Sequence, residues 1–425
     1  MVHARRVKIL LSHPSVAPFV QQAARALDEA GWLDRFVTSL RHDPGSRRQR
    51  FACGAARLVG FDLARQLARR TVTELPPERV ESLPWGELLR LLVGRLDRGG
   101  RVTDFVWSRT EPAFDRAVAR RLTAAHDWVY GFEYASLATF TRAHELGVST
   151  CYDMPAPEPR FVQSLLDAEA ERFPVLRTAY YRHTAKREAA RIARRRAEWD
   201  AADRVIAAST FTRDSFARAG LDVGKVRIVP YGAPPIVGED EAARGGSPDG
   251  PLQLLWAGTF SIRKGAHYLL DAWRRHDLGR HARLRVFGAV TLPDALLHPL
   301  PAGVELGGSI PRRELMAHYQ TSDALVFPTL CDGFGMVVTE AWSRGLPVLT
   351  TPCAGAADLL REKENGLLFP ARDPDALAAT ILGCGERRAE LRAMRSAARA
   401  TAAAWQWSDY RAALRAALVP EPAAP

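Results

Sequence analysis

Short apolar runs recur along the chain, each followed by turn-forming residues and then by a segment whose apolar positions have helical spacing. The first run covers residues 7–12, and similar runs cover 128–132, 205–208, 252–257 and 324–327. Apolar runs of this kind that end at a turn are typical of buried strands, and helical segments between them are typical of a parallel sheet. The pattern therefore predicts an α/β fold built from repeated strand–helix units.

The most informative unit follows the run at 324–327. A glycine-containing turn is followed by a helix pattern at about 336–344 and by a second apolar run at 346–351. The N–H groups of such a loop and of the first helical turn have no partners within the helix, which suits an anionic ligand. Two carboxylates also lie here, Asp332 in the loop and Glu340 on the helix. Carboxylates accept strong hydrogen bonds from sugar hydroxyls.

This unit resembles the nucleotide-sugar signature of the family-four retaining glycosyltransferases, also called glycosyl transferases group 1. In that family an acid is followed by Gly-Phe-Gly, and a second acid comes a fixed distance later on the helix. The matching residues are Asp332, Gly333, Phe334, Gly335 and Glu340. The family usually has Glu first, so Asp332 carries the same charge on a shorter side chain. A buried strand–helix–strand unit with incidental acids is the alternative.

The resemblance implies the GT-B architecture, in which two Rossmann-like domains face each other across a cleft. We expect an N-terminal acceptor-side domain at residues 1–232, a linker at 233–250 and a nucleotide-sugar-binding domain at 251–404. The last helix, at 405–418, is expected to cross back to the first domain.

The activity that the resemblance implies is transfer of a sugar from a nucleotide diphosphate sugar to an acceptor, with retention of anomeric configuration. The acceptor is expected to be a cell-surface glycan, a lipid-linked glycan or a small glycoside. Fold alone does not fix function. A sugar-nucleotide epimerase or hydrolase, and a non-catalytic scaffold or binding protein on the same fold, are the alternatives.

A second loop, after the run at 252–257, places cations at the start of a helix. A helix dipole disfavours Arg263 and Lys264 there unless an anion lies between them and the helix. The chain has only five lysines, so Lys264 is unusual, although chance is the alternative. The resembling family uses a Lys-Gly pair here for the donor diphosphate. Many members have Arg directly after the first Gly, Gly258 in this chain, where this sequence has Thr259.

The resemblance then implies a role for each residue of the donor site. Lys264 and Arg263 would stabilise the departing diphosphate, where negative charge develops. Asp332 and the backbone of residues 333–335 would hold the sugar, and Glu340 would bind the ribose. The expected donor-binding residues are Gly258, Thr259, Arg263, Lys264, Asp332, Gly333, Phe334, Gly335 and Glu340.

Two residues of the first domain are further candidates for the catalytic cleft. His13 follows the first strand, and ligands of open α/β sheets bind beyond the carboxyl ends of strands. A structural histidine is the alternative. Asp153 follows the run at 148–152, where a helix cap or a turn acid is the alternative. Relatives often have His-Asp at this point, and Tyr152 stands in place of that His.

The net charge of +11 favours acidic partners such as a nucleotide diphosphate, nucleic acid or an anionic lipid. A helix predicted at 177–204 concentrates much of this charge. A solvated helix face and a surface for an anionic membrane are the two interpretations. Nucleic acid is not expected as a partner, because neither interleaved aromatic residues nor a recognised nucleic-acid motif accompanies the charge.

The sequence gives no sign of a metal site. Asp373-Pro374-Asp375 looks like the Asp-x-Asp metal motif of other glycosyltransferases, but Asp followed by Pro is typical of a helix N-terminus. The five cysteines are scattered and form no CxxC pair. We therefore expect no metal and no cofactor, with the nucleotide-sugar donor as a substrate.

No apolar run is long enough for a transmembrane helix, and the N-terminal residues lack the apolar core of a signal peptide. Together with the scattered cysteines, this predicts a cytoplasmic protein, including one that works at the inner face of the membrane.

Overall fold

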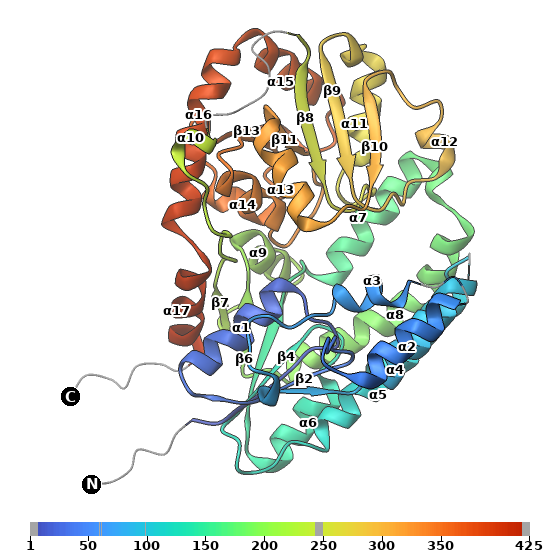
Figure 1. Ribbon diagram of the computed structural model, residues 1–425, viewed down its shortest axis with the longest axis vertical. Helices are drawn as coiled ribbons and strands as arrows, with labels where there is room; N and C mark the ends of the chain where they lie inside the picture. Colours follow the sequence, from blue (N-terminus) through green and yellow to red (C-terminus); the bar gives the residue numbers. More distant parts are fainter. Residues whose placement is uncertain (1–6, 59, 61, 98, 243–249, 419–425) are drawn as a thin grey trace, which may run out of the picture.

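The computed structural model describes residues 7–58, 60, 62–97, 99–242 and 250–418. It contains two parallel sheets, one in each half of an elongated molecule (Figure 1). The 7-stranded sheet has the order β3-β2-β1-β4-β5-β6-β7, and the 6-stranded sheet has the order β10-β9-β8-β11-β12-β13. In both sheets the order reverses beside the first strand, which makes each one doubly wound, and ligands of such sheets bind at this point.

The first domain contains seven strands and nine α-helices among the described residues. The strands are β1 (Ile9–Ser12), β2 (Leu33–Thr38), β3 (Val80–Ser82), β4 (Trp128–Phe132), β5 (Ser149–Met154), β6 (Arg204–Ala207) and β7 (Val226–Ile228). The helices are α1 (Pro18–Glu29), α2 (Arg47–Leu58), α3 (Leu63–Ala68), α4 (Trp85–Leu96), α5 (Arg101–Ala119), α6 (Leu137–Leu146), α7 (Pro159–Arg172), α8 (Ala179–Asp200) and α9 (Thr210–Arg218).

The second half has the same strand–helix alternation. Its strands are β8 (Leu252–Ala257), β9 (Ala282–Phe287), β10 (Val304–Gly308), β11 (Ala324–Phe327), β12 (Val348–Thr350) and β13 (Gly366–Leu368). Its helices are α10 (Glu239–Ala242), α11 (Ala266–Arg275), α12 (Asp294–Leu297), α13 (Arg312–Thr321), α14 (Met336–Ser343), α15 (Pro374–Glu386), α16 (Arg388–Ala404) and α17 (Trp407–Leu418). Short 3-10 turns lie at Pro77–Arg79, Pro174–Leu176, Leu278–Arg280 and Gly355–Leu359.

The central strands of both sheets, such as β1 and β11, are buried on their two faces, which explains why they are continuous apolar runs. In β1, Ile9 and Leu11 belong to one apolar cluster and Leu10 to another. Successive side chains of a strand point to opposite faces, so one short strand contributes to the core on both sides of the sheet.

The final helix, α17, returns to the first domain and packs against α1 (Figure 1). Tyr410, Leu414 and Leu418 are buried. Arg411 reaches Glu29 of α1 at 2.9 Å between Nε and Oε2. Before this helix, the backbone N–H of Ala233 donates to the carbonyl of Trp405 at 2.9 Å, so the expected linker lies against the start of α17. Part of that linker, residues 243–249, is outside the described residues.

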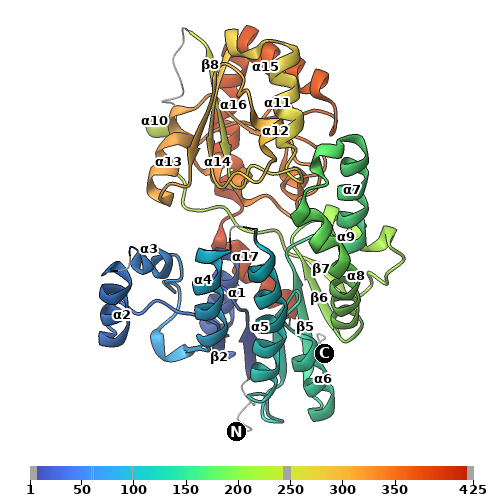
Figure 2. The ribbon, with the colours of Figure 1, turned by 90° about the vertical axis from the view of Figure 1, so that its right-hand side faces the viewer.

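A second connection between the domains comes from α7, which extends from the first domain and reaches the second (Figure 2). Its Glu169 is buried and accepts hydrogen bonds from the Tyr268 hydroxyl at 2.9 Å and from Arg372 Nε at 2.7 Å. His267 Nε2 lies 3.0 Å from the same carboxylate. The contact of α7 with the second domain therefore consists of specific polar interactions around Glu169.

The basic helix, predicted at 177–204, is α8, but most of its charge does not face solvent as an open surface. Arg187 and Arg191 pair with Asp104 of α5, and Arg194 pairs with Asp115 of the same helix. These ion pairs hold α8 against α5. The structure therefore does not support the hypothesis that the basic residues of this helix form a surface for a membrane. The cations of α8 that make no ion pair within the described part of the chain are Arg182 and Lys186.

Among the described residues, no helix combines the length and the apolar character needed to cross a bilayer.

Candidate active site

The loop between β8 and α11 depends on two glycines. Gly258 has a φ of +98° and Gly265 a φ of +76°, a region that side chains with a Cβ rarely adopt. A Cβ at Gly265 would come within 1.9 Å of the Pro328 carbonyl oxygen, and one at Gly258 within 3.1 Å of Lys264 Nζ. The two glycines therefore let this loop fold back closely on β11, with Lys264 above the end of β8.

This loop brings both predicted cations to the predicted acid. Lys264 Nζ lies 3.8 Å and Arg263 Nη1 3.7 Å from Asp332 Oδ2. Burial lowers the pKa of Lys264, although Asp332 acts in the opposite direction. Two cations share one carboxylate, so the cluster keeps a positive charge that can attract an anion.

The glycine loop of residues 332–335 is held from both domains. Asp332 Oδ1 accepts a hydrogen bond from the Phe334 N–H at 3.3 Å. The Gly333 carbonyl accepts from Ser209 Oγ of the first domain at 2.6 Å, and a Cβ at Gly333 would come within 2.0 Å of the Pro155 carbonyl oxygen. Glycine is thus required at 333 by the close approach of the first domain, and at 335 by a φ of +84° that starts α14.

Glu340 is nearly buried and already has two partners. The Tyr319 hydroxyl donates to Oε2 at 3.1 Å, and Arg312 Nη1 lies 2.8 Å from Oε1. The charge of Glu340 is therefore neutralised by Arg312. A ribose that binds Glu340 has to share this carboxylate with Arg312 or displace it.

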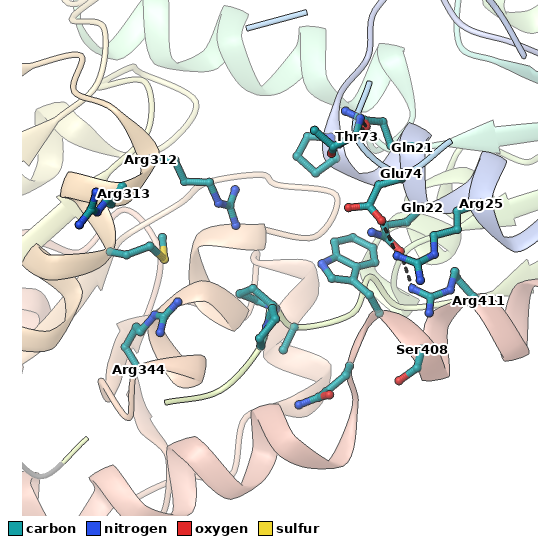
Figure 3. A pocket seen from close by; sticks show the side chains of 17 residues that line it. Gln21, Gln22, Arg25, Thr73, Glu74, Arg312, Arg313, Arg344, Ser408 and Arg411 are labelled. Atoms are coloured by element: carbon teal, nitrogen blue, oxygen red, sulfur yellow. Dashed lines mark hydrogen bonds and ion pairs between the residues drawn. The ribbon is translucent and has the colours of Figure 1, made fainter. Parts of the chain in front are cut away.

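Arg312 also lines a cavity of about 720 Å³ between the domains (Figure 3). Its walls come from α1, the residues before α10, the start of α13 and the start of α17. Arg312, Arg313 and Arg344 enter from the second domain, opposite Arg25 and Arg411 of the first (Figure 3). The positive charge of these walls suits an anionic ligand beside the carboxylate of Glu340.

The first domain contributes a separate cavity of about 530 Å³ at the carboxyl end of its sheet. His13 lies in its wall, with its ring 4.7 Å from that of Phe132 and its Nδ1 accepting from the Ser15 N–H at 2.8 Å. Burial lowers the pKa of His13 to about 4, so the imidazole is neutral at neutral pH. The predicted His13 therefore faces this cavity as an uncharged ring.

The other ionisable groups of this cavity come from α3, α4, α5 and the end of β4. They are Arg69, Arg70, Glu87, Arg90, Glu111 and Glu133. Glu87 pairs with both Arg70 and Arg90. Burial raises the pKa of Glu111 to about 7, with Arg90 acting against it. The cavity is thus polar and charged, as expected for a site that binds hydroxyl-rich molecules.

Glu133 connects the first domain to the donor cluster. It lines the cavity with His13 and also a neighbouring cavity of about 390 Å³, whose wall includes Arg263 of the second domain. Sequence reasoning missed Glu133, although it directly follows β4, and residues at the carboxyl ends of strands are where such ligands bind. Glu133 is therefore a wall residue of both cavities, the one that includes His13 and the one that includes Arg263.

The hypothesis that Asp153 lies at the cleft is wrong. Asp153 is 0% exposed, and its Oδ2 accepts from the Tyr130 hydroxyl at 2.6 Å. Burial raises the pKa of Asp153 to about 7, and Tyr410 of α17 is close enough for the two groups to influence each other. Asp153 is on a face of β5 that α17 covers, so it cannot reach a substrate.

Tyr152, expected at the position of a family histidine, also points away from the cleft. It is fully buried on the opposite face of β5, and its hydroxyl donates to Glu198 Oε2 at 2.6 Å. The pair at 152 and 153 belongs to the core of the first domain.

The predicted helix cap at Asp373 is confirmed. Its Oδ1 accepts from the N–H groups of Asp375 at 3.1 Å and Ala376 at 2.8 Å, and Pro374 begins α15. The resemblance to an Asp-x-Asp metal motif therefore comes from a helix start. Within the described ranges, no three His, Cys, Asp or Glu side chains are grouped in a way that could hold a metal ion.

Comparison with known sequences supports the identification of the second domain. Residues 251–386 match the family model described as glycosyl transferases group 1. The chain is 30% identical over 240 residues to a D-inositol 3-phosphate glycosyltransferase of Xylanimonas cellulosilytica, which covers 50% of this chain and 56% of that protein. It is 29% identical over 140 residues to a glycogen synthase of Mycobacterium tuberculosis, which covers 31% of this chain and 33% of that protein. The matches thus span about half the length of these relatives or less.

Solved structures resemble the chain over nearly its whole length. A sucrose-phosphate synthase of Thermosynechococcus elongatus has a TM-score of 0.64 at 18% identity, and the match covers 96% of this chain and 97% of that one. Anabaena HepE in complex with UDP-glucose has a TM-score of 0.56 at 17% identity, with 97% and 99% covered. The chain therefore has the GT-B fold of two facing Rossmann-like domains, and residues 251–386 within it resemble the glycosyl transferases group 1 family.

Proposed function

We propose that this protein transfers a sugar from a nucleoside diphosphate sugar to an acceptor, with retention of anomeric configuration. The observation that supports this most is the cluster of Arg263, Lys264 and Asp332 at the start of α11. The names of the related glycosyltransferases agree with it. The cluster joins two positive charges to a carboxylate beside a cavity shared by both domains, which is the charge distribution that a sugar diphosphate requires.

In this proposal Lys264 and Arg263 stabilise the diphosphate as it leaves, because negative charge develops there in the transition state. Asp332 accepts hydrogen bonds from the sugar hydroxyls. Glu340 binds the ribose, which competes with Arg312 for the carboxylate. No metal is required for these roles, because the two cations face the diphosphate directly.

The acceptor would bind in the cavity of about 530 Å³ beside His13. Glu133 is the side chain that this cavity shares with the neighbouring one that includes Arg263. We propose that Glu133 accepts a hydrogen bond from the acceptor hydroxyl and directs it toward the sugar. A carboxylate suits this role, because it accepts hydrogen bonds from hydroxyl groups. The proposed acceptor is a cell-surface glycan, a lipid-linked glycan or a small glycoside.

A thermal-shift experiment tests the donor half of this proposal. The panel is UDP, GDP, ADP and their sugar derivatives. A ligand at 100 times its Kd stabilises the folded state by about 2.7 kcal/mol. We expect one nucleoside diphosphate and its sugar to raise the melting temperature of the wild type, and the shift to be lost in Lys264→Gln. If every member of the panel leaves the melting temperature unchanged, the proposal fails and a scaffold function is favoured.

A further inference from the structure

Helix α4 exposes an apolar stripe to solvent. Trp85, Leu89, Leu92 and Leu96 recur at helical spacing and therefore lie on one face of the helix. Their exposed fractions range from 48% to 83%. Single exposed apolar residues are ordinary, but a continuous stripe of large ones marks an interaction surface.

The neighbouring helix α5 packs against α4 through small residues and extends this surface. A Cβ added at Gly86 would lie 3.0 Å from Thr110, and one at Gly94 would lie 3.8 Å from Thr103. The two helices thus contact each other closely along a face that differs from the stripe. Phe105 of α5 is exposed as well. Figure 2 shows α4 and α5 side by side on the face of the first domain that is turned to the viewer, which is its right-hand side in Figure 1.

Helix α2 is more unusual, because none of its residues is buried. Phe51 and Leu58 are 80% and 90% exposed. The helix has no acidic residue and four arginines, Arg47, Arg48, Arg50 and Arg57, none of which makes an ion pair within the described part of the chain. A helix of this length is marginal in water on its own. Contact of these exposed side chains with a binding partner would therefore stabilise α2.

The opposite side of α4 faces the proposed acceptor cavity. Glu87 and Arg90 line that cavity, together with Gln66 and Arg70 from the region of α3. Helix α4 thus separates the cavity from the exposed stripe. A molecule bound to the stripe would lie across α4 from the acceptor cavity.

We propose that the exposed surface of α2, α4 and the start of α5, here called the α2–α4–α5 face, docks on an anionic lipid bilayer. The apolar side chains would enter the boundary between headgroups and acyl chains, and the arginines would contact the anionic headgroups. This rests on the lipid-linked glycan among the acceptors proposed above, but it does not depend on the transfer chemistry. A lipid-linked acceptor anchored in that bilayer would have its headgroup next to the cavity behind α4.

The charge of the face favours a bilayer over other occupants. A two-fold contact between copies of this chain places the same surface on both partners, so the unpaired arginines of two α2 helices would repel each other. Nucleic acid would match the charge, but the Trp85, Leu89, Leu92 and Leu96 stripe offers it mostly aliphatic side chains.

Vesicle sedimentation of the full chain tests this proposal. The vesicles are phosphatidylcholine alone, or phosphatidylcholine and phosphatidylglycerol in equal parts, at low and at high salt. One variant combines Leu89→Ser with Leu92→Ser, and a second combines Arg47→Gln, Arg48→Gln and Arg50→Gln. The matched control on α8 combines Arg182→Gln with Lys186→Gln. Each protein is also tested for its thermal shift with the nucleoside diphosphates, which reports the folded donor site.

We expect the wild type to bind the anionic vesicles and to be released by salt. Each engaged arginine should change the partition coefficient about fivefold. Both variants of the α2–α4–α5 face should lose binding to vesicles and keep their thermal shift with nucleotides, while the α8 control should bind like the wild type.

Equal binding to neutral and anionic vesicles, or loss of binding only in the α8 control, would overturn the proposal. The proposal would also be overturned if the wild type bound no vesicles but formed concentration-dependent dimers, and if Leu89→Ser combined with Leu92→Ser abolished those dimers. If the wild type bound vesicles but showed no thermal shift with any nucleoside diphosphate, the docking proposal would be supported and the proposed function would be refuted.

Discussion

Arg312 Nη1 lies 2.8 Å from Glu340 Oε1, at the wall of the largest interdomain cavity described here. The acid that the resemblance assigns to the ribose is thus paired with a cation of α13. Tyr319 holds the other carboxylate oxygen at 3.1 Å. Both partners fix the orientation of Glu340, so its contribution to nucleotide binding can be tested by a nearly isosteric change.

Glu340→Gln should weaken the nucleoside diphosphate and its sugar to the same degree, because the ribose is common to both. A hydrogen bond to a charged group contributes about 1.5–3 kcal/mol, which corresponds to roughly 10–150-fold in affinity. Isothermal titration calorimetry with both ligands measures this, and the exposed Glu364→Gln is the control. An unchanged affinity for the free nucleotide would show that Glu340 does not bind the ribose.

Substitution of Asp332 should impair transfer of the sugar without changing the affinity for the nucleotide. Asp332→Asn should leave the affinity for the free nucleoside diphosphate nearly intact and lower the rate of sugar transfer, because this carboxylate faces the sugar in the proposed site. Asp332→Glu restores the longer acid that the family usually carries and should change which donor sugar is preferred. Calorimetry and transfer assays on the two variants decide this, and equal losses for both ligands in Asp332→Asn would refute a separate sugar role.

The contribution of Glu111 to stability should fall as the pH rises from about 4.5 to about 7. Burial raises the pKa of Glu111 to about 7, from the usual glutamate value of 4.5. In this window the folded state keeps a proton that the unfolded state has released, which costs on the order of 1.4 kcal/mol per pH unit. Urea unfolding across the window should show a shallower pH slope for Glu111→Gln than for the wild type.

Asp153, whose pKa burial also raises to about 7, serves as the comparison. Asp153→Asn should flatten the same slope without affecting the acceptor site, since Asp153 lies under α17. A slope in Glu111→Gln identical to that of the wild type would mean that Glu111 is ionised throughout.

Sugar transfer should proceed fully in excess EDTA. The two cations of the α11 loop face the proposed diphosphate, and Asp373 is used to cap α15. The assay compares initial rates with and without chelator after extensive dialysis. Loss of activity that Mn²⁺ restores would contradict this prediction.

The elements around the two donor loops of the second domain could be predicted from the sequence. The strands at 252–257 and 324–327 coincide with β8 and β11, because their apolar runs are bounded by turn-forming residues. The glycine loop and α14 follow from the same signals, since a close approach at Gly333 and a positive φ at Gly335 each require glycine.

The first domain was harder to predict, for identifiable reasons. Strands β2 and β3 are short and include outward-facing charges, such as Arg35 and Glu81, which form an ion pair across the sheet edge. Neither strand has the apolar run that marked the others. No strand was therefore predicted between the runs at 7–12 and 128–132.

The site residues whose positions were predicted wrongly are oriented by contacts with distant parts of the chain. Whether Asp153 faces the cleft or the core depends on α17, which lies more than 250 residues later in the chain. The charge of α8 is exposed or paired depending on Asp104 and Asp115 of α5. The local sequence around these residues contains neither partner, so only the folded structure shows where they point.

The most direct test of the account is calorimetry of nucleoside mono- and diphosphates with the wild type and Lys264→Gln, with the exposed Lys363→Gln as control. The account predicts that the wild type binds one nucleoside diphosphate. Lys264→Gln should weaken binding of that diphosphate while leaving the corresponding monophosphate nearly unchanged, because the proposed site places the ammonium at the terminal phosphate. Diphosphate binding that is identical in Lys264→Gln and the wild type would contradict a donor site at the start of α11.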